Sequence, residues 1–465
     1  MALTVFVEGF GVPAPGETAI VAGAGEAGHG RLTIVLVAVV AFAAASRTSS
    51  PPSSSRGCRV RRPATAADDR LDAVSSPAPV ARRMWPLHAA GFTTAFGAHA
   101  VAANLGGFSP DAVTSVLVLG GLLALYDGAE VLLKPVFGAL ADRVGARPVL
   151  LGGLVAFACA SGVYAVADRP GWLWAARLGQ GAAASAFSPA ASALVARLNP
   201  AARHGRAFGS YGFSKSIGYT LGPLLGGVLV WAGGLRLLFV VLATVAAAVA
   251  GWAALAVPVV APLPKTRQTV VDLARRLTDP VFLAPTGALA AATAALSVGV
   301  GFLPVAGRAA GLGTVATGAA VSVLAVCAAV VQPRAGRALD DGRLTVRRGL
   351  TAGLAVTAAG LAAATLPGLA GVLIGAGVIG VGTGLITPVG FAALAAATPA
   401  ARLGQTMGAA ELGRELGDAG GPLLVAAVAS AAGLPYGFAV LAVLTAGGAV
   451  LAGATRRRGA AAPPG

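Results

Sequence analysis

The sequence predicts an all-α membrane protein in which twelve transmembrane helices form two pseudo-symmetric six-helix bundles. An apolar composition, a series of helix-length apolar stretches and an internal repeat support this prediction. Of the 465 residues, 56% are apolar and 11% are charged. Soluble domains carry about a quarter charged residues. The composition therefore argues against a soluble enzyme and against intrinsic disorder. It also argues against nucleic-acid binding as the reason for the net charge of +16.

Twelve apolar stretches follow Met84, each long enough to cross a bilayer. A helix needs about 20 mostly apolar residues to span the hydrocarbon core. The predicted spans are residues 85–107, 112–135, 148–167, 171–196, 207–232, 236–260, 281–304, 313–332, 349–366, 369–396, 405–431 and 435–455. We expect domains at 84–260 and 281–458, a cytoplasmic linker at 261–280 and a tail at 459–465.

The positive charges predict the orientation. With the segment before the first span in the cytoplasm, most of the 34 Lys and Arg residues lie on that side, as the positive-inside rule requires. The predicted outer loops then hold Arg169, Arg236 and Arg308. Both ends of the twelve-span region are expected to be cytoplasmic, in a bacterial cytoplasmic membrane.

An internal repeat with a spacing of 199 residues relates the two halves. Matching positions are Gly205 and Gly404, Gly209 and Gly408, Gly218 and Gly417, and Gly222-Pro223 and Gly421-Pro422. Lys215 matches Arg414, which places a cation at the same depth in each half. Parallel six-helix repeats with a site at their interface are a known transporter architecture.

The polar segment after the second span carries the first motif. It reads Gly138-Ala-Leu-Ala-Asp142-Arg143-Val-Gly145-Ala-Arg147. Its glycines permit a tight turn, and Asp142 can accept hydrogen bonds from a helix N-terminus or pair with an arginine. A degenerate copy containing Asp340 follows the eighth span. The alternative interpretation is a short loop with cytoplasmic positive charge.

The fourth span carries the second motif, Arg177-Leu-Gly-Gln180-Gly. An arginine inside the membrane is costly unless it is paired or hydrated, so it is a functional candidate. We favour a role of Arg177 and Gln180 in proton coupling or substrate contact. The alternative is an arginine that reaches the nearby outer surface.

The fifth span carries the third motif, which combines glycines at fixed spacing with one proline. Its members are Gly209, Gly218, Gly222, Pro223, Gly226 and Gly227. Glycines at i, i+4 and i+8 leave a groove without side chains, and Pro223 kinks the helix. The alternative is simple close packing of two helices.

Together the three motifs resemble signatures of the major facilitator superfamily, over about Met84 to Arg458. The resemblance implies that the Gly138–Arg147 segment and Asp340 control closure of the two halves on the cytoplasmic side. It also implies that the fifth-span motif belongs to proton-coupled antiporters, and therefore favours export over import.

Ionisable residues inside two predicted spans are further candidates for coupling. Asp127, Glu130 and Lys134 share one face of the second span, and Glu411, Arg414, Glu415 and Asp418 share one face of the eleventh. Carboxylates near cations in a low-dielectric site can exchange pairing for protonation. The alternative is a static network that ties helices together, which we favour for Glu130 and Lys134.

The N-terminal 83 residues do not fit this architecture. Residues 1–45 include Pro13-Ala-Pro-Gly-Glu17-Thr and resemble the start of the DedA family, whereas residues 46–83 form a low-complexity basic linker. We interpret the segment as a remnant of a neighbouring reading frame, with Met84 as the natural start. The alternative is a genuine fusion.

The expected function is proton-coupled export of a small amphipathic or drug-like compound by a monomer. Its expected partners are the substrate, protons and lipid, and its energy source is the proton gradient, without a cofactor. Cys58, Cys159 and Cys327 lack metal-ligand spacing, so no metal site is expected. The alternatives are a symporter or uniporter and a non-transporting sensor or scaffold. No nucleophile–base pattern predicts an enzyme.

Overall fold

The computed structural model describes residues 77–104, 112–166, 170–259 and 279–454. The elements are α5 (Pro77–Asn104), α6 (Ala112–Val144), α7 (Ala146–Val166), α8 (Pro170–Arg197), η2 (Ala201–Arg203), α9 (His204–Ala256), α11 (Pro280–Ala309), α12 (Thr314–Asp340), α13 (Val346–Ala363), α14 (Gly368–Ala396), η3 (Ala400–Arg402), α15 (Leu403–Ala432) and α16 (Leu434–Ala454). These elements confirm the all-α prediction for the described residues. The DedA-like fragment, most of both predicted linkers and the tail lie outside them.

α6 and α12 extend furthest beyond their predicted C-terminal ends. α6 continues past residue 135 to Val144, and α12 continues past residue 332 to Asp340. The first motif is therefore mostly helical, and the tight turn expected of its glycines is confined to Gly145, which has a φ of 103°. Gly138 instead lies within α6. Its role is a close helix contact, as shown below.

The fifth and sixth predicted spans form one continuous element, α9, with a break inside it. Gly233 and Gly234 have non-helical backbone angles there, and Gly234 has a φ of 67°. Glycine adopts this left-handed region without the steric cost that a Cβ imposes. The break falls between the predicted spans 207–232 and 236–260.

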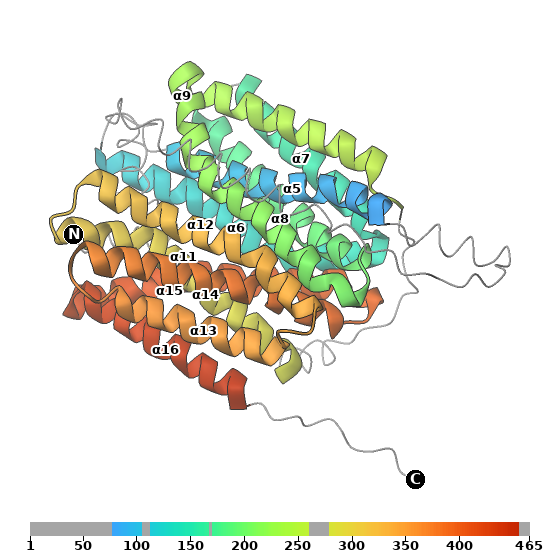
Figure 1. Ribbon diagram of the computed structural model, residues 1–465. Helices are drawn as coiled ribbons and strands as arrows, with labels where there is room; N and C mark the ends of the chain where they lie inside the picture. The colour runs from blue at the N-terminus through green and yellow to red at the C-terminus, as the bar shows by residue number, and fades with distance from the viewer. Residues whose placement is uncertain (1–76, 105–111, 167–169, 260–278, 455–465) are drawn as a thin grey trace, which may run out of the picture.

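The helices divide into two groups that we call the first half (α5–α9) and the second half (α11–α16). Figure 1 shows the first half on one side of the molecule, in blue to green, and the second half on the other, in yellow to red. Two helix pairs make the most extensive contacts between the halves: α6 with α15, and α9 with α12. We call these the α6–α15 interface and the α9–α12 interface. α9 also contacts α14, and α8 also contacts α15, less extensively.

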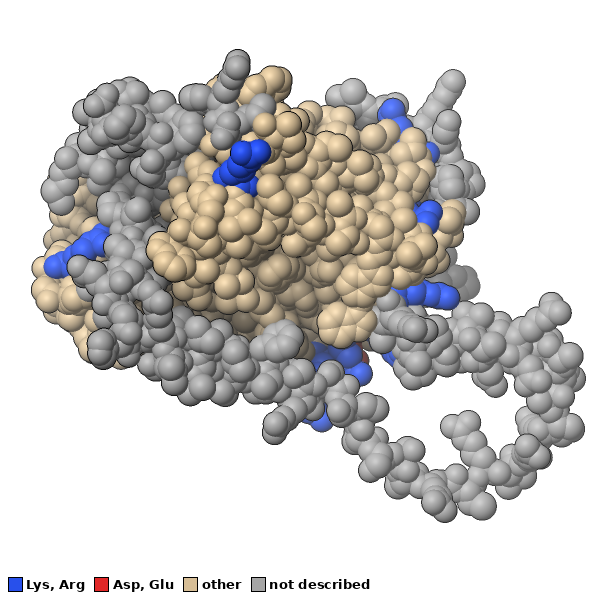
Figure 2. Space-filling model, turned by 90° about the horizontal axis from the view of Figure 1, so that it is seen from above, with Lys and Arg blue, Asp and Glu red and all other residues tan. Residues whose placement is uncertain are grey.

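Six of the described helices are long and apolar enough to cross a membrane. The full count of twelve spans remains a prediction. α15 is less apolar because it carries Glu411, Arg414, Glu415 and Asp418. Figure 2 shows a broad uncharged face, with Lys and Arg side chains mainly toward its margins. Such a surface suits contact with lipid, since hydrocarbon cannot solvate charges.

Candidate functional site

Asp142, at the end of α6, caps the start of α15 in the other half. Its carboxylate accepts hydrogen bonds from the backbone N–H groups of Gly404 at 2.8 Å and Gln405 at 2.7 Å. Arg197, at the end of α8, pairs with the same carboxylate at 2.9 Å and also donates to the Ala400 carbonyl at 3.0 Å. One carboxylate thus satisfies free N–H groups at a helix start, where the helix dipole favours negative charge.

Asp340, at the end of α12, makes the equivalent contact with α9 in the first half. Its carboxylate accepts hydrogen bonds from the N–H groups of Gly205 and Arg206, both at 2.8 Å. The Arg206 side chain, which is half exposed, lies 3.7 Å from Asp340 and also pairs with Asp341. The internal repeat therefore produces two capping contacts, one at each interface between the halves.

Close backbone packing beside the capping contacts explains Gly138 in the first motif and Gly336 in its copy. A Cβ on Gly138 would lie 3.0 Å from the Cα of Gly408 and would collide with the carbonyl of Gly404. A Cβ on Gly336 would likewise collide with the carbonyl of Gly205. Glycine is required at these positions because the two helices of each interface approach without intervening side chains.

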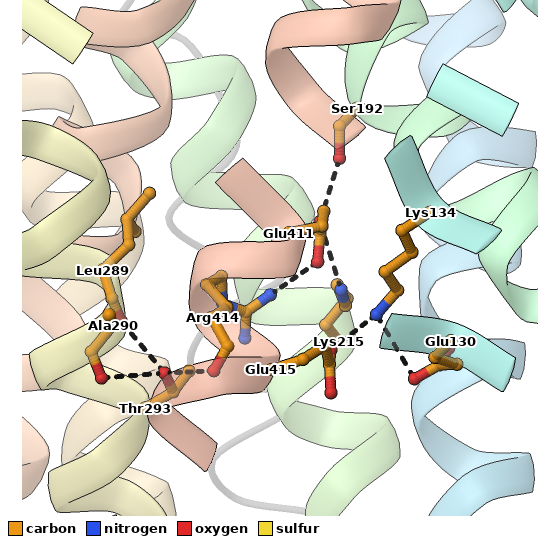
Figure 3. Close-up of polar contacts among 10 residues, drawn as sticks. All are labelled: Glu130, Lys134, Ser192, Lys215, Leu289, Ala290, Thr293, Glu411, Arg414 and Glu415. Carbon is orange, nitrogen blue, oxygen red and sulfur yellow. Dashed lines mark hydrogen bonds and ion pairs between the residues drawn. The ribbon is translucent and has the colours of Figure 1, made fainter. Parts of the chain in front are cut away.

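A network of buried charges lies further along the α6–α15 interface. The Lys134 ammonium on α6 lies 2.5 Å from the Glu415 carboxylate on α15 and 3.2 Å from the Glu130 carboxylate on its own helix. The Lys134 side chain is only 3% exposed. Figure 3 shows Lys134 between the two carboxylates. The predicted pair of Glu130 and Lys134 is therefore present, and it extends across the interface to Glu415.

Glu411 is the centre of the second part of this network. Its carboxylate lies 3.1 Å from Arg414 on α15 and 3.8 Å from Lys215 on α9, and it accepts a hydrogen bond from Ser192 on α8 at 3.4 Å. The Glu411 side chain is 1% exposed. Thr293 on α11 donates to the Arg414 carbonyl at 2.8 Å. Lys215 and Arg414, which match in the repeat, thus contact the same carboxylate.

Asp127 and Asp418 lie near the network at its edges. Both interact electrostatically with Glu415. Asp418 accepts a hydrogen bond from Ser297 on α11. The structure therefore gathers all of the predicted coupling carboxylates around one place between the halves.

Arg177 is buried on α8 and does not reach the surface. The residue is 1% exposed, its guanidinium lies 4.2 Å from the centre of the Tyr126 ring, and it donates to Gln180 at 3.4 Å. Gln180 in turn donates to Ser161 on α7 at 2.8 Å. The alternative of an arginine reaching the outer surface is therefore wrong, since cation–π and hydrogen-bond contacts hold it inside.

Four glycines of the third motif, Gly209, Gly218, Gly222 and Gly226, are covered by neighbouring helices. A Cβ on Gly218 would lie 2.7 Å from the Phe92 carbonyl, and one on Gly226 would lie 2.9 Å from the Ala100 Cβ, so both face α5. Gly222 also faces α5, whereas Gly209 faces α12 at the Gln332 carbonyl. The predicted groove along α9 is therefore filled by the α5 backbone.

Two predicted residues of the first motif lie apart from the contacts between the halves. Arg143 is exposed, and Arg147 donates to the Ala254 carbonyl within the first half at 2.7 Å. Arg197 and Gln332 belong to none of the three sequence motifs, although both make contacts between the halves. The register of the repeat is the signal that could have identified Gln332, because it aligns the second motif copy with the first.

The chain matches the family described as Major Facilitator Superfamily over residues 87–342 and 316–465. Local similarity links it to the uncharacterized MFS-type transporter Rv1250 of Mycobacterium tuberculosis, at 38% identity over 23% of this chain and 18% of the relative. It is 33% identical to the multidrug resistance protein MdtH of Yersinia pestis over 24% of this chain and 28% of that protein. The matched segments thus span less than a third of these relatives.

Solved structures share the fold over most of the chain. The human organic anion transporter MFSD10 (TETRAN) superimposes with a TM-score of 0.68 at 18% identity, covering 80% of this chain and 99% of that one. The transporter FucP in the outward conformation gives a TM-score of 0.65 at 13% identity, covering 79% and 97%. Because the family match extends over most of the sequence, the chain belongs to the Major Facilitator Superfamily.

Proposed function

We propose that the protein is a proton-coupled exporter of a small amphipathic or drug-like compound. In this proposal twelve spans form two six-helix bundles that alternately expose a central site to the two sides of a bacterial cytoplasmic membrane. The protein acts as a monomer, both ends of the twelve-span region are cytoplasmic, and no substrate bond is made or broken. The proton gradient supplies the energy.

The charged network between the halves is the observation that carries the proposal. Lys134–Glu415 and Lys215–Glu411 each join a first-half cation to a second-half carboxylate. Buried ion pairs are costly to break unless the charge that remains is neutralised. A carboxylate can be neutralised by a proton, so protonation and separation of the halves become linked.

The capping contacts of Asp142 and Asp340 fit the same cycle. They join the halves at the end that the sequence predicts to be cytoplasmic. Release of both contacts would be required to open the site to the cytoplasm. The names of the matched multidrug resistance protein and of the organic anion transporter support an amphipathic substrate.

Proteoliposomes with an imposed pH gradient test the proposal. We expect gradient-driven accumulation of at least one compound in a panel of fluorescent amphipathic cations and anions, together with proton counterflow. Accumulation coupled to protons moving in the same direction would indicate a symporter, and equilibration without proton flux would indicate a uniporter. Absence of flux for every compound, with substrate-independent binding to a membrane partner, would favour a sensor or scaffold.

A further inference from the structure

The two interfaces between the halves carry equivalent polar contacts of different chemistry. At the α9–α12 interface, the Gln332 amide donates to the Ser216 hydroxyl at 2.9 Å. In the register that aligns Asp142 with Asp340, Gln332 takes the place of Lys134, and in the register that aligns Gly205 with Gly404, Ser216 takes the place of Glu415. The same position is therefore an ion pair at one interface and a neutral hydrogen bond at the other.

The charges do not lose their partners equally when the halves separate. Lys134 keeps Glu130 on its own helix at 3.2 Å, and Glu411 keeps Arg414 at 3.1 Å. For Glu415, Lys134 is the one cation within ion-pair distance among the described residues. Separation of α6 from α15 therefore leaves the Glu415 carboxylate without its counter-charge.

We propose that Glu415 is the proton-binding group whose protonation releases the ionic contact with Lys134 at the α6–α15 interface, while the equivalent contact of Gln332 with Ser216 at the α9–α12 interface does not respond to pH. The inference rests on the proposed proton-coupled cycle. A proton taken up from water converts the Glu415 carboxylate to a neutral acid. The acid no longer attracts Lys134, which stays compensated by Glu130, so the closed arrangement loses one of its ionic contacts.

Other charged and titratable side chains lie around Glu415 and contribute to its electrostatic environment. On its own helix, Glu411, Arg414 and Asp418 interact with one another or with Glu415. From the first half, it is faced by Tyr126, Asp127, Glu130 and Lys134 on α6 and by His99 on α5. Lys215 on α9 contacts Glu411, and Arg177 on α8 contacts Tyr126, so these two cations lie behind the residues that face Glu415. Among these groups, His99 is the one whose side chain titrates near neutrality in water, so its variant is included in the test.

Spin labels at Ala201 and Ala400 provide a readout that needs no substrate. These alanines match in the repeat and lie exposed on η2 and η3, in opposite halves beside the capping contacts. Both are changed to cysteine in a background with Cys58, Cys159 and Cys327 replaced by serine, and the purified protein is placed in lipid nanodiscs. Pulsed electron–electron distance measurements are then made in acidic and in mildly alkaline buffer.

The parent protein should show a larger separated population in acid, with a longer label distance. Glu415→Gln, which mimics the protonated acid, should show the separated population at both pH values. The double variant Lys134→Gln with Glu415→Ser copies the neutral pair of the other interface and should also lose the pH response. Ser216→Ala and His99→Gln should keep it.

Each other outcome has a defined meaning. A pH response that persists in both Glu415 variants would overturn the role of Glu415 but leave the proton-coupled function intact. Loss of the response in Ser216→Ala would overturn the asymmetry, and loss in His99→Gln would move the proton site to His99. A parent protein without any pH response would refute the inference. Proton flux in proteoliposomes would then show whether the proposed function also fails.

Discussion

Asp142 on α6 and Gly404 on α15 are joined by a hydrogen bond of 2.8 Å, although 262 residues separate them in the sequence. The contact places a carboxylate at the start of a helix from the other half. Because the charge, the free N–H groups and the helix dipole all favour this position, the observed contact between the halves is stabilised by a local capping interaction.

Asp142→Asn should open this end of the molecule. Asparagine keeps one acceptor oxygen but removes the negative charge that serves Arg197, Gly404 and Gln405 together. We expect a larger separated population between the labels at Ala201 and Ala400, at both pH values, and slower transport turnover. An unchanged distance distribution would mean that the contact does not hold the halves together.

Of the two arginines beside the capping contacts, Arg197 should contribute more to thermal stability than Arg206. The Arg197 side chain is 5% exposed and bonds both Asp142 and the Ala400 carbonyl, whereas the Arg206 side chain is 50% exposed. Hydrogen bonds to a charged group are worth about 1.5–3 kcal/mol when desolvated, and exposed pairs about 0–1 kcal/mol. Arg197→Gln should therefore lower the thermal unfolding midpoint in detergent more than Arg206→Gln. Equal effects would contradict this assignment.

Comparison of Asp142 with its partner Arg197 shows which parts of the site the sequence could predict. The roles of Asp142 and of its copy Asp340 follow from a motif and its repeat, because a carboxylate near a helix start has a definite use. The partner Arg197 could not be predicted, since its pairing depends on how α8 lies against α15. The same holds for Glu415 and Lys134, which lie on helices far apart in the chain and meet only through packing. Helix positions were predictable within several residues, but the ends of α6 and α12 were not, since neither Pro135 nor Pro333 ends its helix.

Replacing a glycine on α9 by alanine should destabilise the protein only where the added Cβ would meet a neighbouring atom. A Cβ on Gly218 would lie 2.7 Å from the Phe92 carbonyl, whereas a Cβ on Gly251, also on α9, would meet nothing within 4 Å. Overpacking a tight contact costs about 1–3 kcal/mol. We expect Gly218→Ala to lower the thermal unfolding midpoint clearly and Gly251→Ala to leave it unchanged or raise it. If Gly218→Ala were as stable as the parent protein, α5 and α9 could not be packed as closely as the structure has them.

The pair of Lys134 and Glu415 should show strong energetic coupling in a double-mutant cycle. Lys134→Met leaves Glu130 and Glu415 without their shared cation inside the protein, and removing one partner of a buried pair costs about 3–5 kcal/mol. Glu415→Met is milder, because Lys134 keeps Glu130. The double variant should therefore be more stable than the sum of the two single changes allows, since it removes the second carboxylate together with the cation. Thermal unfolding of the four proteins in the same detergent measures this coupling. The same cycle at Gln332 and Ser216, with leucine and alanine, should give a smaller coupling, because a neutral hydrogen bond is weaker than a contact between two charges. Additive effects at Lys134 and Glu415 would show that their contact contributes nothing to the closed state.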